Sequence, residues 1–438
     1  MNERRVDVLV VGGGVSGVCA AIAAARCNVS VLLVEATSFL GGITTEGPLE
    51  ALMTFHDEQG QIIAGIAQDI VDRLIQYEGS PGFVSDTVGY CRSLVPYDSE
   101  VLKKVLFDLL AEAGVTILLN SLVTEVKRTQ KGIYGMVVTG TSSNEYISCD
   151  VVIDASGGAD AARLAGAEVL FGREPDKRVQ PMSTLCKVAG VDIEKLRSYV
   201  KQHTSTFKLA LDADLDMQYL HLWGFRDILE KGYASGALSL RRSELQLMVT
   251  PRDGVVVINF SRFNGDPRVL EDISKAQMET LTQCHEVLHW LQINIEAFAD
   301  AHIVHTGHVG IRESRRVRGL YELQPEDITK GKKFNHIVAR GVFPIDIHDP
   351  LGDSLMSKKV AKAYGIPMES LISANIPNLF MAGRCICASH EALASARITA
   401  TAMATGQASG VMAALKAQSG VVDYAQVKAL LEDQKVLL

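Results

Sequence analysis

The segment at residues 285–289 reads His-Glu-Val-Leu-His, which is the signature of a zinc protease when it lies on a helix. Two imidazoles four residues apart would bind one zinc ion, and the glutamate would activate the metal-bound water. The next residues, Trp-Leu-Gln-Ile-Asn-Ile-Glu, lack the glycine and the third histidine with which metzincins continue. Polar and apolar residues recur at helical spacing from about 269 to 297, as in an ordinary surface helix. The sequence therefore predicts a structural helix without a metal site, and no protease activity.

Three glycines near the N-terminus have the spacing of a dinucleotide-binding turn. Gly12, Gly14 and Gly17 lie between a strand-like apolar run and an alanine-rich helix, and Glu35 ends a second apolar run. Gly12 would permit the tight turn, Gly14 would let the backbone approach a pyrophosphate, and Gly17 would let the helix pack on the strand. The pyrophosphate would then lie at the positive end of the helix, with the Glu35 carboxylate at a ribose hydroxyl.

The residues after Glu35 resemble a more specific motif. Gly41 and Gly42 in "EATSFLGGITTEG" resemble the extended fingerprint of two-dinucleotide-binding flavoproteins of the glutathione reductase superfamily. In those proteins the glycine pair brings backbone amides to the ribose and diphosphate of FAD. The disulfide reductases of that superfamily carry a redox cysteine pair next, whereas this chain has Ile43-Thr44-Thr45. The resemblance therefore implies an FAD cofactor without thiol–disulfide chemistry.

Three further segments resemble cofactor-contacting parts of the same superfamily. Val123 follows a predicted helix and strand, "IDASGG" ends a buried strand, and "LFMAGRCICASHEALASARITATAMATG" resembles the terminal FAD motif. In that last motif the start of a helix points at the isoalloxazine carbonyl and stabilises the reduced flavin through its dipole. The resemblance implies these FAD-contacting residues: Gly12, Gly14, Ser16, Gly17, Glu35, Ala36, Gly41, Gly42, Ile43, Thr44, Val123, Ala155, Ser156, Gly157, Gly383, Arg384, Ile398 and Thr399.

A narrower resemblance comes from "GHVGIRESRRVRGLYELQPEDI", which we expect to begin with a strand over 310–316, together with "GRCICASHEALAS" and "IDASGGAD". These segments are similar to a bacterial family of FAD-dependent oxidoreductases related to the fumarate reductase and succinate dehydrogenase flavoproteins. The similarity covers residues 5–165 and 305–415. It departs at "ASGGAD", where an acidic residue is expected after the first glycine, and at Cys387, where serine is more usual. It implies a reaction class and no particular substrate.

Two arginines and two histidines are the candidate catalytic residues. The resemblance places Arg312, His348, His390 and Arg397 on segments near the flavin. A base there would take a hydroxyl or amine proton while a hydride leaves carbon. An arginine would hold a substrate carboxylate in two parallel hydrogen bonds. The sequence leaves open whether the arginines instead neutralise the FAD diphosphate, and whether the histidines are only packed.

Composition excludes several other classes of function. The chain has 438 residues and a formal net charge of -8, which argues against a nucleic-acid partner. Its eight cysteines include no Cys-x-x-Cys pair, which fits free thiols in a reducing cytoplasm. No uncharged apolar stretch approaches ~20 residues outside the first strand and helix, so we expect a cytoplasmic protein without a membrane span.

The elements that must position these residues define the expected fold. The sequence predicts an α/β protein with a Rossmann-type FAD-binding domain of the two-dinucleotide-binding flavoprotein fold, made of residues 1–165 and 335–438. Residues 166–334 would form an α+β substrate or cap domain. "SELQLMVTPRDGVVVINFSRF" predicts a β-hairpin that turns at Asp253-Gly254, which implies an antiparallel sheet in that domain.

The predicted function is an FAD-dependent oxidoreductase that transfers a hydride between the flavin and a small, anionic organic substrate. Only one dinucleotide fingerprint is found, so the external electron acceptor or donor is left open. A flavin monooxygenase that uses external NAD(P)H, and a non-redox or RNA-modification flavoprotein, are the alternatives. The sequence also leaves open the direction of electron flow, a covalent link from Cys385 or Cys387 to FAD, and assembly into a homo-oligomer.

Overall fold

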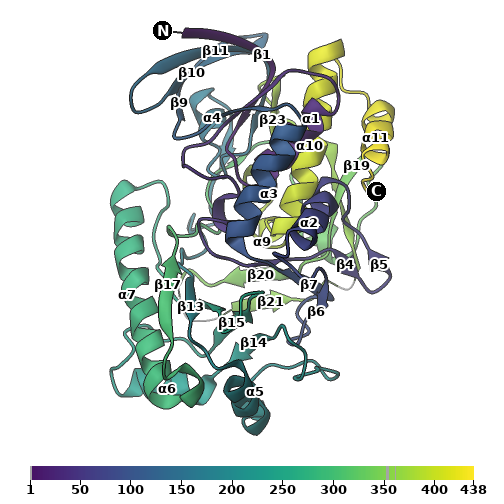
Figure 1. The fold of residues 1–438 in the computed structure, drawn as a ribbon. Helices are drawn as coiled ribbons and strands as arrows, with labels where there is room; N and C mark the ends of the chain where they lie inside the picture. The colour runs from purple at the N-terminus through teal and green to yellow at the C-terminus, as the bar shows by residue number, and fades with distance from the viewer. Residues whose placement is uncertain (1, 352–354, 361) are drawn as a thin grey trace.

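The computed structural model describes residues 2–351, 355–360 and 362–438 (Figure 1). Its largest sheet has parallel strands in the order β8, β2, β1 and β11. Strand β11 then pairs along its other edge with two different strands, antiparallel β10 in its first half and parallel β23 in its second half. Strand β9 follows β10 at the edge. The strands span Asn2–Val11 (β1), Val31–Val34 (β2), Thr116–Leu118 (β8), Leu122–Thr129 (β9), Gly132–Thr139 (β10), Asn144–Asp154 (β11) and Leu379–Met381 (β23).

The sequence explains why this sheet is buried. The four residues of β2 and the residues Val8–Val11 of β1 are apolar and buried on both faces, as expected for central parallel strands covered by helices. Helices α1 and α10 pack against these strands, and α3, α2 and α11 lie around them (Figure 1). The helices span Val15–Ala25 (α1), Ile66–Gln76 (α2), Ser99–Glu112 (α3), His390–Ala396 (α9), Thr399–Ser419 (α10) and Tyr424–Asp433 (α11).

Helices α1 and α10 cross with their backbones in contact. A Cβ atom at Gly406 would overlap the carbonyl oxygen of Ser16, and one at Gly410 would overlap the carbonyl oxygen of Ala20. Only glycine allows this approach, because any side chain at these positions would push the helices apart. The crossing joins an element near the start of the chain to one near its end.

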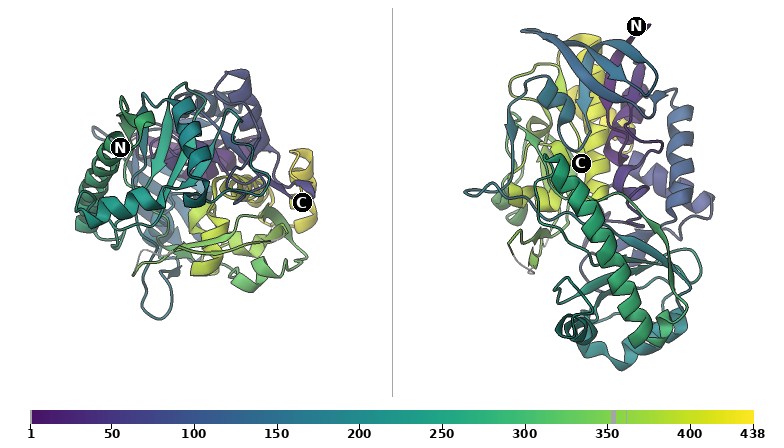
Figure 2. Two further views of the ribbon diagram at one scale, coloured as in Figure 1. Left: turned by 90° about the horizontal axis from the view of Figure 1, so that it is seen from below. Right: turned by 90° about the vertical axis from the view of Figure 1, so that its left-hand side faces the viewer.

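A second sheet, with its own hydrophobic core, forms the other part of the molecule. Its strands are antiparallel throughout, in the order β14, β15, β16, β13 and β17. Its core consists of buried apolar residues between Cys186 and Ala301. The right panel of Figure 2 shows this part below the parallel sheet, and Figure 1 shows the long helix α7 along its left-hand side. We call it the cap; its elements span Cys186–Ala189 (β13), Ile193–Gln202 (α5), His221–Gly224 (β14), Arg226–Ala234 (α6), Leu245–Val249 (β15), Val256–Asn259 (β16), Leu270–Asn294 (α7) and His302–Thr306 (β17).

Smaller paired strands complete the fold. They span Ala51–Leu52 (β3), Val84–Ser85 (β6), Ser93–Pro96 (β7), Val169–Leu170 (β12), Arg316–Val317 (β18), Ile337–Gly341 (β19), Ile345–His348 (β20), Leu355–Lys358 (β21) and Tyr364–Pro367 (β22).

The structure confirms the predicted fold class, a Rossmann-type α/β sheet combined with an antiparallel sheet. The predicted hairpin is β15 and β16, whose turn contains Gly254 with a φ of 65°. The strand expected over residues 310–316 is wrong, because only Arg316–Val317 is a strand. There the Arg312 guanidinium donates to Pro181 O at 2.6 Å and the Glu313 carboxylate accepts from Gln180 N at 3.2 Å. These side-chain bonds replace the backbone ladder that a strand would need.

The His-Glu-Val-Leu-His segment lies in the middle of α7. His285 and His289 are exposed on the helix surface, whereas Glu286 accepts hydrogen bonds from Ser239 N at 3.0 Å and Ser239 Oγ at 2.6 Å. Within the described residues, no group of three or more His, Cys, Asp or Glu side chains could hold a metal ion. The described part of the chain also contains no helix that is long and apolar enough to cross a membrane.

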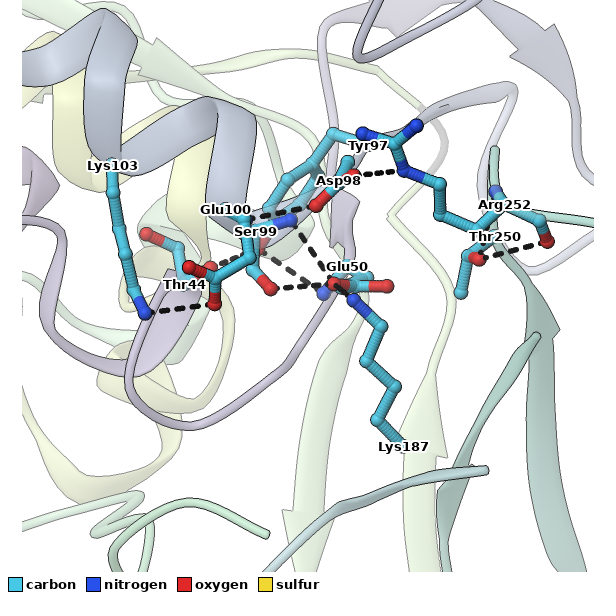
Figure 3. A network of polar contacts seen from close by, with 10 residues as sticks. All are labelled: Thr44, Glu50, Tyr97, Asp98, Ser99, Glu100, Lys103, Lys187, Thr250 and Arg252. Atoms are coloured by element: carbon cyan, nitrogen blue, oxygen red, sulfur yellow. Dashed lines mark hydrogen bonds and ion pairs between the residues drawn. The ribbon is translucent and has the colours of Figure 1, made fainter. Parts of the chain in front are cut away.

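Two ion pairs join the cap to the start of α3 (Figure 3). The Lys187 ammonium of β13 lies 2.7 Å from Glu50, whose carboxylate also accepts from Ser99 Oγ at 2.6 Å and Ser99 N at 3.0 Å. The Glu50 side chain is fully buried. Arg252, in the turn between β15 and β16, pairs with Asp98, the N-cap residue of α3. We call these two pairs the cap latch.

We predict that Lys187→Met lowers the free energy of unfolding by about 3–5 kcal/mol, because it leaves the Glu50 carboxylate buried without its ion-pair partner. Glu50→Gln added to it should recover part of the loss. Denaturant titrations of the two single variants and the double variant give the coupling between the residues. Lys195→Met, which removes an exposed pair with Glu296, is the control and should leave the midpoint almost unchanged. Additive effects of the Lys187 and Glu50 changes would contradict the prediction.

We also predict that the α7 histidines hold no functional metal. His285→Ala combined with His289→Ala should leave the melting temperature and the metal content unchanged, since both imidazoles are exposed. Metal analysis of wild type and double variant, with and without a chelator, tests this. Stoichiometric zinc that disappears from the double variant together with activity would refute it.

Candidate functional site

A cavity of about 420 Å³ lies between the parallel sheet and the cap. Its lining comes from both sequence halves: the β1–α1 turn, the end of β2, the glycine pair after it, the end of β11, and the segments before α9 and at the start of α10. We call this side of the cavity the cofactor end. The cap strands, β20 and the segment around Arg312 line the other side, the cap end.

The β1–α1 turn uses its three glycines in three different ways. Gly12 has a φ of 102°, and a Cβ atom there would lie 2.5 Å from Ala155 O. A Cβ atom at Gly17 would overlap Gly12 O, so this glycine lets helix and turn pack together. A Cβ atom at Gly14 would meet nothing within 4 Å. Gly14 therefore faces open space in the cavity, where a diphosphate could approach the backbone.

Two helices begin at this cavity without a side-chain cap. Gly14 is the N-cap residue of α1 and Ile398 is the N-cap residue of α10, and neither position has a side-chain hydrogen bond to the helix. The first amides of a helix carry partial positive charge and need acceptors. A diphosphate at α1 and a flavin carbonyl at α10 would supply acceptors at both places, so the cofactor end fits FAD.

Glu35 lines the cavity at the end of β2, and its carboxylate is already oriented. Its Oε2 accepts from Gly13 N at 2.6 Å, and its Oε1 accepts from Thr37 N at 2.9 Å. The carboxylate therefore lies beside the glycine turn, as expected of a residue that contacts a ribose.

Most of the residues predicted to contact FAD line this one cavity. These are Gly12, Gly14, Ser16, Glu35, Gly41, Gly42, Ile43, Ala155, Ser156, Gly157, Gly383, Arg384, Ile398 and Thr399. Four others do not form part of its lining: Gly17, Ala36, Thr44 and Val123. Thr44 donates to Gly41 O at 2.8 Å, and so holds the glycine pair in shape. Val123 lies in β9, paired with Val138.

Arginines gather at the cap end. Arg242, Arg312 and Arg397 line the cavity, and Arg262 lies behind them, with its guanidinium 3.1 Å from His348 Nδ1. Burial, and then the charges of Arg397, Arg262 and Arg242, lowers the pKa of Arg312 well below its usual value. Arg312 therefore lies close enough to the other three guanidinium groups to be repelled by each of them.

Asp346 is the only carboxylate among the described residues that line the cap end. It accepts from Tyr90 Oη at 2.9 Å and lies 3.8 Å from Arg397. Burial favours a raised pKa, but His348, Arg397 and the Tyr90 hydroxyl together bring the pKa of Asp346 to about 2. Burial, followed by the charge of Arg312, lowers the pKa of His348 to about 3. Among the described residues that line this end, the carboxylate of Asp346 thus lies near the guanidinium groups of Arg312 and Arg397 and the imidazole of His348.

Other candidate residues lie outside the cavity. His390 is buried with its Nδ1 2.7 Å from Glu313, which also pairs with Arg316. His390 thus lies in a buried cluster with Glu313 and Arg316, at the start of α9. Cys385 and Cys387 are buried as well, and neither lines the cavity.

Several cavity residues were not found by sequence reasoning. Asp346 could have been predicted as a cavity residue, because it lies two residues before His348 on strand β20 and its side chain is therefore on the same face of the strand. Tyr90 and Arg242 lie in connecting segments without a motif, and only the tertiary structure brings them to the site. Trp223, Gln246 and Asn259 of the cap sheet also line the cavity, and nothing in their local sequence singles them out.

Comparisons with known proteins agree with this geometry. A geranylgeranyl bacteriochlorophyll reductase-like protein from Thermoplasma acidophilum is 14% identical with a TM-score of 0.52, covering 100% of this chain and 85% of its own. p-Nitrophenol 4-monooxygenase from Pseudomonas putida DLL-E4 is 10% identical with a TM-score of 0.50, covering 99% of this chain and 85% of its own. At such identities the likeness shows the fold alone.

No curated protein matches the sequence. The family described as FAD dependent oxidoreductase matches residues 7–431, which is nearly the whole chain. The chain therefore belongs to this family of FAD-dependent oxidoreductases, and it is an enzyme whose cofactor is FAD.

Proposed function

We propose that the enzyme transfers a hydride between FAD and a small anionic organic substrate, which the arginines at the cap end bind. The observation that carries this proposal is that two buried guanidinium groups, those of Arg312 and Arg397, line the same end of the cavity. Both interact with the charge of Asp346, which is the one carboxylate among the described residues that line this end. Nε of Arg397 is buried and, within the described structure, has no hydrogen-bond partner.

An anion would complete this arrangement. Buried guanidinium groups are costly unless they are paired and hydrogen-bonded. A carboxylate that accepts two parallel bonds from one arginine would provide the pairing and would fix the distance of its neighbouring carbon from the flavin. Arg312 and Arg397 are the residues we propose for this role, since both line the cavity.

His348 has a different proposed role. A group whose pKa is about 3 is a weak general base at neutral pH, so proton abstraction by His348 is disfavoured. Its Nδ1 accepts from Arg262 and its Nε2 lies 3.4 Å from Asp346. We propose that it positions these two charges beside the substrate.

The cofactor end supports the FAD contacts proposed for the glycine turn, Glu35, the glycine pair, residues 155–157 and the start of α10. FAD supplies the hydride acceptor or donor when it is bound. We also retain as proposals the division into an FAD-binding domain (1–165 and 335–438) and a cap domain (166–334), and the relation to the fumarate reductase flavoproteins. The separate apolar core of the cap supports the division.

We predict that Gly14→Val yields protein that retains little FAD, because the added side chain would occupy the open space beside the turn. Absorbance at the flavin bands, relative to protein concentration, measures the occupancy. Gly140→Val is the matched control, since a Cβ atom there meets its nearest neighbours at an ordinary 3.7 Å and far from the cavity. A Gly14→Val protein with full FAD content would contradict the proposed diphosphate position.

We predict that Arg312→Lys and Arg397→Lys each weaken substrate binding about 10- to 100-fold, because lysine keeps the charge but loses the two parallel bonds. The substrate is first sought as the compound that bleaches the bound flavin most rapidly without oxygen. Binding and turnover are then measured with FAD content as the internal check, and Arg268→Lys, at an exposed pair with Asp266, as the control. If both variants turn over normally, or if the best bleaching compound is uncharged, the anionic substrate is wrong.

A further inference from the structure

Three polar side chains form a row across the cap sheet and line the cavity. Trp223 of β14 lies opposite Gln246 of β15, which in turn lies opposite Asn259 of β16. Strands β14 and β15 are visible side by side in the lower part of Figure 1. Residues that are opposite one another on neighbouring strands point to the same face of a sheet. The row therefore forms one wall of the cavity.

A chain of hydrogen bonds fixes the direction of each amide in this row. The buried carboxylate of Asp86 lies 2.7 Å from His221 Nδ1, which donates to it. In the neutral imidazole with its proton on Nδ1, Nε2 is an acceptor, and Gln246 Nε2 donates to it at 2.8 Å. This leaves Gln246 Oε1 to accept from Asn259 Nδ2 at 3.0 Å. The series of hydrogen bonds ends at Asn259 Oδ1, which is an acceptor.

The row ends in two buried atoms that lack partners. Among the described residues, neither Asn259 Oδ1 nor Trp223 Nε1 has a hydrogen-bond partner, although both atoms are buried. One is an acceptor and the other a donor. Such atoms are rare in folded proteins because a buried polar group without a partner is costly. At the wall of a substrate cavity, a bound molecule can supply the missing partners.

We propose that Asn259 and Trp223 determine specificity for a hydroxylated carboxylate, with Asn259 Oδ1 accepting from a substrate hydroxyl and Trp223 Nε1 donating to a substrate oxygen. The inference rests on the proposed function, because the arginines at the cap end bind the carboxylate. An ammonium group is disfavoured at Asn259, since the arginines Arg242, Arg312 and Arg397 line the same cavity. Two strand spacings of about 4.8 Å separate the backbones of Asn259 and Trp223, so the two residues contact different polar atoms of the substrate.

The test uses the FAD-loaded enzyme and pairs of acids that differ only in hydroxyl groups: mandelate with phenylacetate, 3-phenyllactate with 3-phenylpropionate, and gluconate with hexanoate. Shifts in the flavin absorbance spectrum give the dissociation constant of each. We expect the hydroxylated member of at least one pair to bind about tenfold more tightly or better, because only it satisfies the buried atoms.

Two variants then locate the preference. Leucine is similar in volume to asparagine. Asn259→Leu should therefore weaken binding of the hydroxylated acid and leave binding of the unhydroxylated acid at least as tight, so that the ratio of their two dissociation constants approaches one. Trp223→Phe keeps the ring and removes only the N–H donor, so it should lower the ratio partially. Asn294→Leu, on the exposed end of α7, is the control and should keep the wild-type ratio.

The outcomes separate this inference from the function on which it rests. If both members of every pair bind equally while Arg397→Lys weakens both, the hydroxyl recognition is wrong and the anionic substrate stands. A preference that survives in both Asn259→Leu and Trp223→Phe also overturns the assignment. If no carboxylate binds at all, the proposed function fails together with the inference.

Discussion

The contact between the backbones of α1 and α10 is the constraint on which the site depends. Gly406 and Gly410 allow it, because side chains there would overlap the carbonyl oxygens of Ser16 and Ala20. Gly17 extends the same close packing to the β1–α1 turn. Two helices that approach this closely can begin at one cavity, and so present two uncapped N-termini to a single cofactor. The backbone amides at the cofactor end are thus brought together by glycines, which have no side chain to keep the two helices apart.

The cap end of the cavity differs from the cofactor end, because charged side chains line it. Arg242 of the cap lies close to Arg312, and both Arg312 and Arg397 interact with the charge of Asp346. This arrangement requires the cap to keep a fixed position relative to the parallel sheet. The buried pair of Lys187 with Glu50 meets that need, and the residues on both sides of Glu50 line the cavity. The latch therefore acts on the wall of the site as well as on stability.

The parts that the sequence predicted correctly are those specified within short segments. The glycine turn, strand β23, the start of α10 and the β15–β16 hairpin each depend on residues that are neighbours in the chain. The cap end could not be predicted in this way. Arg242 and Tyr90 reach the cavity through connections that carry no motif, and the row on the cap sheet exists only because the register places Trp223, Gln246 and Asn259 opposite one another. His390 shows the converse, because its proximity to the FAD motif in the sequence did not bring it to the cavity lining; it is buried beside Glu313 instead.

The divided partnership of β11 has a consequence for the chain during synthesis. Its second half pairs with β23, which the ribosome adds only after the whole cap has emerged. Until then, the second half of β11 lacks its β23 partner, and the face of α1 that packs against Gly406 and Gly410 is uncovered. Apolar groups at both places remain exposed to water. The cap strands, in contrast, find all their neighbours between residues 186 and 306. We therefore expect the cap to fold first in the nascent chain. The N-terminal part should need chaperones until α10 has been synthesised.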